Sequence, residues 1–450
     1  MTDLAMNDMT PVDIGDDDEA DAIRLAAALV SKRCGLITEL VPQGRGPEEP
    51  CPPHLWNATL THYNFWNTSL GMRLTGGKGL TEARAKLSAM GEAIERYSAF
   101  HWDPHRIRVG LASETAITPP DCVLYSPTQY AAGSKYLPWD RSVETSWITG
   151  IELPTGAPVD LPASLVYLLG PPPRVEDNFT AITSNGLAAG KDLTHAILGG
   201  AYEVIERDAF MLTWLNKLPA TRIKTPEHGC HAARIIRHYN RFGLTIRLLS
   251  LATDGDVTVV MAIAENPDDD GAFRHIGLGS NVDPVAATDQ AVFELCQMRP
   301  GIRSRTAAGE YRERLSTYDG VRTIDDHVLF HFLAAHAHEF DFLAVDGAEC
   351  DLADLPRPGC QSAQDELDII VRSVTGAGAR IAYVDITAPD IAPLGPSVVR
   401  VIITGFQPIS FGHGEGRHGG ARLYDAPVRW GLRKAPLTEA ALNQCPHPLA

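Results

Sequence analysis

Three long segments of the chain predict helices, and apolar residues recur at helical spacing in the first of them. In the first, residues 81–100, they fall three and four positions apart, which is the period of an amphipathic helix. The second segment covers residues 194–214, and the third begins after Asp283-Pro284 and ends near residue 298. We therefore predict a long helix over each of these segments.

Shorter segments rich in branched and aromatic residues predict strands between and beyond these helices. They cover residues 56–72, 244–252, 257–266 and 398–405. Many prolines between residues 101 and 180 indicate loops and short strands there. Because helices and antiparallel-looking strand pairs alternate irregularly, we expect an α+β fold of mixed, largely antiparallel sheets packed with long helices, rather than a doubly wound sheet.

The N-terminal segment is strongly acidic. Eight of the 56 acidic residues fall within the first 21 positions, before the first basic residue at Arg24. Like charges repel there and few apolar groups offset the cost of ordering, so we predict that residues 1–20 form a disordered tail. Residues 21–41 predict a helix, a turn at Gly35 and a strand.

Charge and hydropathy argue against two broad classes of function. The net charge is −17 at pH 7, which argues against general nucleic-acid binding. No apolar run approaches the ~20 residues that span a bilayer, and the N-terminus has neither the basic start nor the apolar stretch of a signal peptide. We therefore expect no membrane association and a cytoplasmic location.

Carboxylate pairs recur on the first two predicted helices. Glu92 and Glu95 are three residues apart on the first, Glu203 and Glu206 on the second, and residues at this spacing share one helical face. On the first helix the pair is offset from the apolar residues by two positions, about 200°, so it points away from the main apolar face. A solvent-exposed face explains either pair alone, but the recurrence favours a shared site. Paired carboxylates suit Mg²⁺, which takes oxygen ligands and bridges proteins to phosphate groups.

Cationic and glycine-rich segments lie near these pairs. Arg96 and Arg207 could balance the carboxylates or bind phosphate groups through their planar donors. We predict a loop at residues 76–79, Gly-Gly-Lys-Gly, that opens the first helix, where backbone N–H groups and the helix dipole favour an anion and Lys78 adds a charge. A tight turn explains these glycines equally well. Residues 184–186, Ser-Asn-Gly, could likewise hold the polar groups of a nucleotide or form only a turn.

Taken together, these segments resemble the three signatures of the YcaO family. The order and spacing of the signatures extend over about residues 60–305, and their combination is highly specific. The residues that carry the resemblance are Gly77-Lys78-Gly79 with Ser88, Glu92, Glu95, Arg96 and Tyr97 in the first signature, Ser184-Asn185-Gly186 and Gly190 with Glu203, Glu206, Arg207 and Asp208 in the second, and Gly277, Gly279, Asp283-Pro284, Glu294 and Gln297 in the third.

The resemblance implies a YcaO-type fold, usually homodimeric, with residues 21–450 as the catalytic domain and a Pro-containing tail at residues 443–450. It implies that Mg²⁺ and ATP are bound by the glutamate helices. The implied metal ligands are Glu92, Glu95, Glu203 and Glu206. The implied contacts to the nucleotide come from Lys78, Ser88, Arg96, Ser184, Asn185, Arg207, Gln297 and Arg303.

The resemblance also implies a reaction, because members of the family activate backbone amides. In the azoline branch, a Cys, Ser or Thr side chain of a ribosomally made precursor peptide attacks the preceding carbonyl, whose oxygen takes the γ-phosphoryl group of ATP. Phosphate then leaves and a thiazoline or oxazoline ring closes, so catalysis is mostly positioning and charge neutralisation. Sulfide or an amine as nucleophile gives a thioamide or a macroamidine instead, and the glutamates do not distinguish these branches. A non-catalytic ATP-binding scaffold is a further alternative, against which the intact glutamate pairs argue.

The C-terminus favours the azoline branch, whose members commonly end in a Pro-rich tail that reaches the active site. Two prolines flank His447 and stiffen the last residues into an extended shape. In this interpretation His447 is the general base, since an unperturbed imidazole titrates near neutrality, and Ala450 supplies a terminal carboxylate. A frayed terminus is the alternative. His413, Arg417 and His418 are further acid–base candidates, in a Gly-rich stretch that a flexible surface loop explains as well.

Two partner proteins follow from the same resemblance. No fused domain for capture of a leader peptide is evident in the sequence, so we expect a separate partner protein that binds the leader and presents the precursor peptide. Oxidation of an azoline to an azole would need a separate flavin dehydrogenase.

Overall fold

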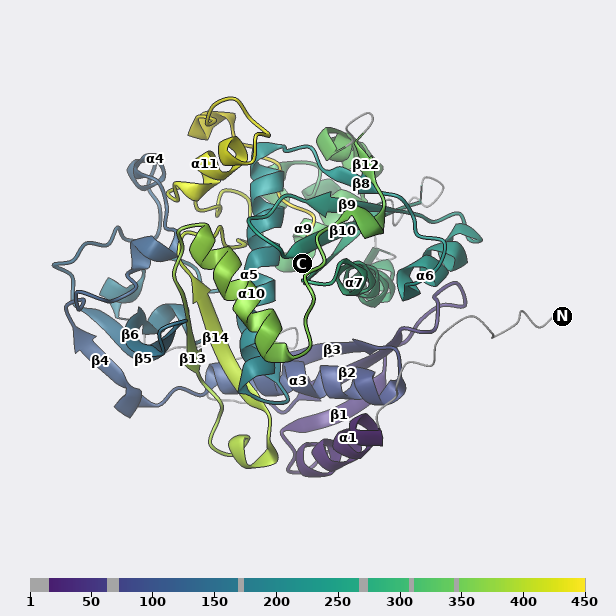
Figure 1. Cartoon of the computed structure of the whole chain (residues 1–450), viewed down its shortest axis with the longest axis horizontal. Coiled ribbons are helices and arrows are strands. Elements are labelled where there is room, and N and C mark those ends of the chain that lie inside the picture. The colour runs from purple at the N-terminus through teal and green to yellow at the C-terminus, as the bar shows by residue number, and fades with distance from the viewer. Residues whose placement is uncertain are drawn as a thin grey trace.

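Three sheets and the helices packed on them make up the fold (Figure 1). The structure is a computed structural model, and it describes residues 16–62, 73–168, 174–266, 274–306, 311–343 and 348–449. Among the described strands, only the short pair β8 and β12 runs parallel, and the other pairs are antiparallel. The predicted α+β fold with largely antiparallel sheets is therefore confirmed.

The first sheet holds the N-terminal strands in the order β1-β2-β3. Helices α1 and α3 pack together beside this sheet, and α3 contacts both β2 and β3. The predicted helix over residues 81–100 is α3, and its N-cap is Thr81, whose side chain accepts from the Arg84 N–H. The elements are α1 (Asp16–Leu29), β1 (Ile37–Pro42), β2 (His54–Leu60), β3 (Leu74–Gly79) and α3 (Glu82–Phe100).

The predicted disordered tail, residues 1–20, lies mostly outside the described residues. Its last five residues instead form the first turns of α1. Asp18 lies 3.3 Å from Arg84 of α3, and Ala22 and Leu25 are buried. Acidic side chains also suit the positive end of a helix dipole, so the charge that suggested disorder here supports a helix.

The second sheet has six strands, in the order β4-β5-β13-β14-β7 with β6 beside β5. Helix α5 (Leu193–Asn216), which matches the second predicted helix, packs on β7 and β14 and is flanked by α10 (Ala363–Gly376). The strands are β4 (Ile107–Gly110), β5 (Thr145–Leu153), β6 (Ala157–Pro162), β7 (Leu187–Gly190), β13 (Ile381–Asp385) and β14 (Ser397–Ile403).

The third sheet has five strands in the order β11-β10-β9-β8-β12. Helix α7 (Pro284–Thr306) packs on β11 and β10. It runs past the predicted end near residue 298 and past Pro300, because Ile302 in its last turns is buried in the core. The strands are β8 (Thr221–Ile223), β9 (Thr245–Leu251), β10 (Thr258–Glu265), β11 (Arg274–Asn281) and β12 (Glu349–Cys350). The remaining helices are α4 (Pro127–Ala131), α6 (His231–Asn240), α8 (Tyr311–Arg314), α9 (Ile324–Phe332) and α11 (Arg422–Arg429).

The three long helices each join two of the sheets. Helix α3 contacts β3 of the first sheet and β7 and β14 of the second. Helix α5 lies between the second and third sheets, and α7 contacts β11 of the third sheet and β3 of the first. This cyclic arrangement sets the three helices around a common centre (Figure 1). No helix in the described ranges is both long and apolar enough to cross a bilayer.

The glycine-rich segment at residues 76–79 belongs to strand β3, so the predicted loop is wrong. Its residues pair with β2 in a regular antiparallel register. A Cβ atom on Gly77 would lie 2.2 Å from the Ala85 carbonyl oxygen, and one on Gly79 would lie 2.7 Å from the Ala85 nitrogen. These glycines therefore allow the strand backbone to approach α3 closely, and a turn does not require them. Gly277 and Gly279 of β11 face α7 in the same way.

Candidate functional site

The three long helices each direct one glutamate back to the segment that precedes the helix. In each case a backbone N–H, in the strand or just before it, donates to the carboxylate. Such hydrogen bonds to an ionised acceptor are short and directional, so they hold each carboxylate in one orientation. The bonds are Gly76 N–H to Glu92 Oε2 at 2.8 Å, Gly186 N–H to Glu203 Oε2 at 3.1 Å, and Leu278 N–H to Glu294 Oε2.

Carboxylates from α3 and α5 lie close enough to influence one another. Burial raises the pKa of Glu95 well above its usual range, and the charges of Glu203 and Glu92 raise it further. Burial also raises the pKa of Glu203, although Arg207 opposes the rise. The glutamate pairs predicted on the two helices therefore face each other.

The same interaction extends to α7. Burial raises the pKa of Glu206 to about 7; Arg207 opposes this rise, and Glu294 and Glu203 add to it. Glu294 carries part of the third signature but was not among the predicted metal ligands. The structure adds it to the carboxylate cluster, which we define as Glu92, Glu95, Glu203, Glu206 and Glu294.

Arg207 lies among three of these carboxylates. Its Nη1 is 3.2 Å from Glu206 Oε1, its Nε is 3.9 Å from Glu203 Oε1, and its Nη2 is 4.0 Å from Glu294 Oε1. Arg96 pairs with Glu92 one helical turn away. Both arginines that the sequence analysis singled out therefore lie in the cluster.

The cluster suits a divalent cation by its chemistry. Its donors are carboxylate oxygens, which are the ligands that Mg²⁺ prefers. The raised pKa values of Glu95, Glu203 and Glu206 indicate that their negative charges are costly in this arrangement, and a cation between them would relieve that cost. Within the described part of the chain, no three acidic, His or Cys side chains are grouped closely enough to hold one ion. Metal binding would therefore require these side chains to turn away from their present partners.

Two predicted nucleotide contacts lie beside the cluster. Lys78 of β3 is close enough to Glu206 that its charge slightly lowers the pKa of that carboxyl. The Gln297 side chain lies against β3, because a Cβ atom on Gly76 would be 2.3 Å from its amide nitrogen. The structure thus brings the first and third signatures to the same place.

For three other predicted nucleotide contacts, the structure does not show a position beside the cluster. Ser88 and Ser184 are exposed. Arg303 Nη1 donates to Glu48 Oε1 at 2.8 Å, so this guanidinium is held by the segment before β2. The roles proposed for these three residues stay predictions.

Apart from the exposed Gln444, the C-terminal tail is buried, so the frayed terminus considered above is wrong for residues 443–449. Backbone carbonyls of the tail accept hydrogen bonds from Trp214, His331 and His327. Pro448 and Leu449 line a small cavity of about 10 Å³ together with Glu294. The described tail therefore ends beside the carboxylate cluster.

His447 is held in the protein interior. Its Nε2 donates to the Ser410 carbonyl oxygen at 2.7 Å, its Nδ1 accepts from the Leu449 N–H, and its ring stacks on His327. Burial lowers the pKa of His447 well below its usual range. Both ring nitrogens are thus engaged, and action as a general base would require the tail to move. That role stays a prediction, and Ala450 lies outside the described residues.

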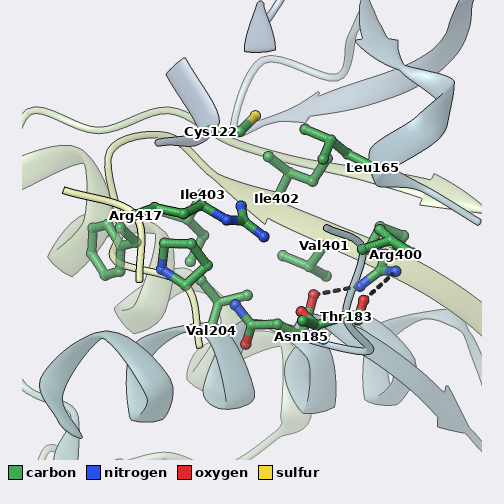
Figure 2. Close-up of a pocket in the computed structure, with 13 residues that line it drawn as sticks. Cys122, Leu165, Thr183, Asn185, Val204, Arg400, Val401, Ile402, Ile403 and Arg417 are labelled. Atoms are coloured by element: carbon green, nitrogen blue, oxygen red, sulfur yellow. Dashed lines mark hydrogen bonds between the residues drawn. The ribbon is translucent and has the colours of Figure 1, made fainter. Parts of the chain in front are cut away.

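Arg400 is a buried cation that the sequence analysis did not identify. It lies on β14 and donates to the carbonyl oxygens of Thr183 and Asn185 (Figure 2). Burial lowers its pKa to about 10, and the charges of Glu203 and Glu95 oppose that fall. A single arginine within the apolar strand SVVRVII was the available signal.

Comparisons with known proteins place this chain among proteins of the same architecture. An uncharacterized protein of Methanothermobacter thermautotrophicus is 29% identical over 343 residues, which cover 74% of this chain and 82% of that protein. A heterocyclase solved in complex with substrate and cofactor is 25% identical with a TM-score of 0.79, over 96% of this chain and 57% of that one. The chain thus spans little more than half the length of that heterocyclase.

A further solved structure and a family profile point to the same family. The structure of YcaO from Methanopyrus kandleri bound with AMPPCP and Mg²⁺ shares the fold, with 21% identity and a TM-score of 0.62 over 85% of this chain and 89% of that one. Residues 76–407 match the profile of the family described as YcaO cyclodehydratase, ATP- and Mg²⁺-binding. This chain belongs to the YcaO family.

Proposed function

We propose that this protein uses ATP to phosphorylate backbone amides of a ribosomally made precursor peptide, and that it thereby closes Cys, Ser or Thr residues into thiazoline or oxazoline rings. The observation that carries the proposal is the convergence of carboxylates from α3, α5 and α7 in a chain of a family described as ATP- and Mg²⁺-binding. A similar solved protein is a heterocyclase in complex with substrate and cofactor, which supports the azoline branch.

Within this proposal, the carboxylate cluster holds Mg²⁺ and the groups beside it hold the nucleotide. The metal ligands would come from Glu92, Glu95, Glu203 and Glu206, with Glu294 as an added candidate. Bound Mg²⁺ would neutralise charge on the phosphate oxygens. Lys78 and Arg207 would supply further positive charge, and Gln297 could bond a polar group of the nucleotide.

The proposed reaction consumes ATP and no other co-substrate. The substrate thiol or hydroxyl adds to the preceding carbonyl carbon and loses its proton. The former carbonyl oxygen attacks the γ-phosphorus, and the bond from that phosphorus to ADP breaks. The amide nitrogen then loses its proton as the carbon–oxygen bond to phosphate breaks, so the products are the ring, ADP and inorganic phosphate. The protein contributes by positioning these groups and by stabilising charge.

The C-terminal tail supports the azoline branch of the family. Its described end lines the same small cavity as Glu294, which supports a tail that contacts a substrate held at the cluster. We propose His447 as general base and the Ala450 carboxylate as a further group, both acting after a movement of the tail. We also propose that the protein is a homodimer, that a separate partner protein presents the precursor by its leader, and that any oxidation to an azole is performed by a flavin dehydrogenase.

Mass spectrometry tests the proposal directly. The purified protein, a precursor peptide rich in Cys, Ser and Thr, the leader-binding partner, ATP and Mg²⁺ are incubated, and phosphate release is followed in parallel. We expect the peptide to lose one water per ring, with one phosphate released per ring. Exchange of oxygen for sulfur would indicate a thioamide-forming enzyme. ATP binding without peptide-dependent phosphate release would indicate a scaffold and contradict the proposal.

A further inference from the structure

A second cavity adjoins the carboxylate cluster. It has a volume of about 60 Å³ and is lined by β14, by the segment before β7, by Val204 of α5 and by Arg417 of the loop that follows β14 (Figure 2). The segment before β7 joins the two sites, because Asn185 lines the cavity and the next residue, Gly186, donates its N–H to Glu203. Apolar side chains such as Ile403 and Phe406 form the other walls.

Arg417 places a buried guanidinium in this cavity. The residue is 4% exposed, and Figure 2 shows its guanidinium directed into the cavity. Its Nη2 donates to the Ala181 carbonyl oxygen at 2.8 Å, whereas its Nε has no hydrogen-bond partner among the described residues. Burial lowers the pKa of Arg417, and Tyr125 and Cys122 oppose that fall, but no carboxylate is among the described groups that influence it. A buried cation without an anionic partner is costly, so an anion in the cavity would stabilise it.

A second buried arginine strengthens the case for an anion in the cavity. Arg400 also lines the cavity, and its positive charge and that of Arg417 lie close enough to disfavour each other. Glu203 and Glu95 offset the charge of Arg400 from the side of the carboxylate cluster. An anion held beside Arg417 would relieve the remaining repulsion. A neutral water molecule would not.

The size and donors of the cavity indicate which anion it could take. At about 10–15 Å³ for one water, about 60 Å³ offers roughly four to six atom-sized positions, which suits a tetrahedral oxyanion with five heavy atoms and is too small for a nucleoside. The Asn185 carboxamide points toward Arg417, with its amide nitrogen on the cavity side (Figure 2). The cavity therefore offers N–H donors from a guanidinium and a carboxamide, and no carboxylate is among its lining residues.

We propose that this cavity binds inorganic phosphate through Arg417 and Asn185. The inference rests on the proposed function for the source of the ligand, because that reaction releases phosphate at the neighbouring carboxylate cluster. Phosphate held here has left the reacting centre and is separated from it by Arg400 and the segment before β7. In this proposal Asn185 serves the phosphate site and not the nucleotide, contrary to what the family resemblance implied. Accumulated phosphate then inhibits turnover from a place that ATP does not occupy.

The test is direct binding of orthophosphate to the full chain by calorimetry, without nucleotide, Mg²⁺ or peptide. We expect saturable binding to the wild type, weakened at least about tenfold in Arg417→Met, which corresponds to about 1.4 kcal/mol. Arg417→Lys keeps the charge and should lose less. Arg429→Met removes an arginine from nearby α11, outside the cavity, and should bind phosphate like the wild type.

A second variant keeps the test decisive if Arg417→Met fails to fold, which circular dichroism would reveal. Cys122→Leu fills part of the cavity and removes no charge, so it should also weaken phosphate binding. Absence of saturable binding to the wild type, or equal binding to the wild type and both cavity variants, would overturn the proposal. Displacement of phosphate by a saturating non-hydrolysable ATP analogue with Mg²⁺ would also overturn it, because the cavity would then belong to the nucleotide site.

Failure of the inference and failure of the proposed function give different results. If the protein binds phosphate in the cavity but never closes rings, the phosphate site stands and the proposed reaction is contradicted. If it closes rings but does not bind phosphate, only the inference about the cavity is contradicted. If both hold, phosphate should inhibit the wild type non-competitively against ATP, and this inhibition should be lost in Cys122→Leu.

Discussion

Arg207 Nη1 lies 3.2 Å from Glu206 Oε1, although these two residues are sequence neighbours on α5. Adjacent positions on a helix do not normally face each other. Here the arginine turns toward the carboxylate cluster, and its Nη2 also lies 4.0 Å from Glu294 on α7. One guanidinium therefore links the glutamates of two helices. The arrangement keeps Glu206 buried in a cluster of like charge, which is the basis of the first two predictions.

Replacing Glu206 should abolish activity and leave the fold intact. Glu206→Gln keeps the shape of the side chain but removes a charge that we propose to bind Mg²⁺. We expect kcat for peptide-dependent phosphate release to fall at least about 100-fold, since loss of one preorganised electrostatic group costs about 10²–10³ in kcat. Glu19→Gln, on the exposed surface of α1, is the matched control and should keep full turnover. Turnover of Glu206→Gln at the wild-type rate would remove Glu206 from the site.

The same variant should change how stability depends on pH. The pKa of Glu206 is raised from 4.5 to about 7 in the folded protein. A raised folded pKa contributes stability that is fully present below about pH 4.5 and is lost as the pH rises through about 7. Glu206→Gln stays neutral throughout. Its free energy of unfolding relative to the wild type should therefore increase across this range by up to ~1.4 kcal/mol per pH unit. Urea denaturation with EDTA and without nucleotide measures this free energy, and a pH-independent difference would contradict the raised pKa that burial and the neighbouring carboxylates cause.

For a histidine that contacts the C-terminal tail, we expect the pH dependence of stability to have the opposite sign. His327 Nδ1 donates to the His447 carbonyl oxygen and its Nε2 accepts the Gly412 N–H, each at 2.8 Å, so protonation of the ring would break the second bond. Burial lowers the pKa of His327 from 6.5 to about 4. The stability that this neutral ring contributes is present above pH 6.5 and is lost as the pH falls toward 4.

We therefore expect His327→Phe to flatten the acid side of the stability profile. The decline in the free energy of unfolding between pH 6.5 and 4 should become shallower by up to ~1.4 kcal/mol per pH unit. His338→Phe makes the same change at an exposed ring and should leave the slope as in the wild type. Identical slopes in both variants would show that His327 does not titrate as inferred. Urea denaturation at each pH provides the measurement.

Two glycines test the close contact between β3 and α3. A methyl group on Gly77 would lie 2.2 Å from the Ala85 carbonyl oxygen, so Gly77→Ala must push the strand from the helix and should destabilise the protein by about 1–3 kcal/mol. Gly91 lies within α3, and a methyl group there meets nothing within 4 Å. Gly91→Ala should stabilise the protein by about 0.5–1 kcal/mol. Urea denaturation gives the free energy of unfolding of both variants. Equal changes in the two would contradict the close packing of β3 on α3.

Periodicity predicted most of the secondary structure in this chain. The first long helix could be placed because it presents apolar residues at a repeated spacing over about five turns, which no strand or loop would do. Strands β9, β10 and β14 were placed by short runs of branched apolar residues. The secondary structure around residue 78 was harder to predict, because its glycines fit a loop as well as a strand. They fit a strand only when α3 packs on it, and that packing is a tertiary contact.

The sequence by itself determined the helices, the strands and the carboxylate pairs, because each depends on residues close together along the chain. It also contained the combination of signatures that identifies the family. Only the tertiary structure decided that Glu294 joins the cluster, that Arg400 lies behind it, and that Arg417 enters a cavity beside it. These residues come from α7, β14 and a C-terminal loop, and their positions depend on how three sheets pack around three helices. No local pattern encodes that packing, since it is the sum of many weak apolar contacts between distant segments.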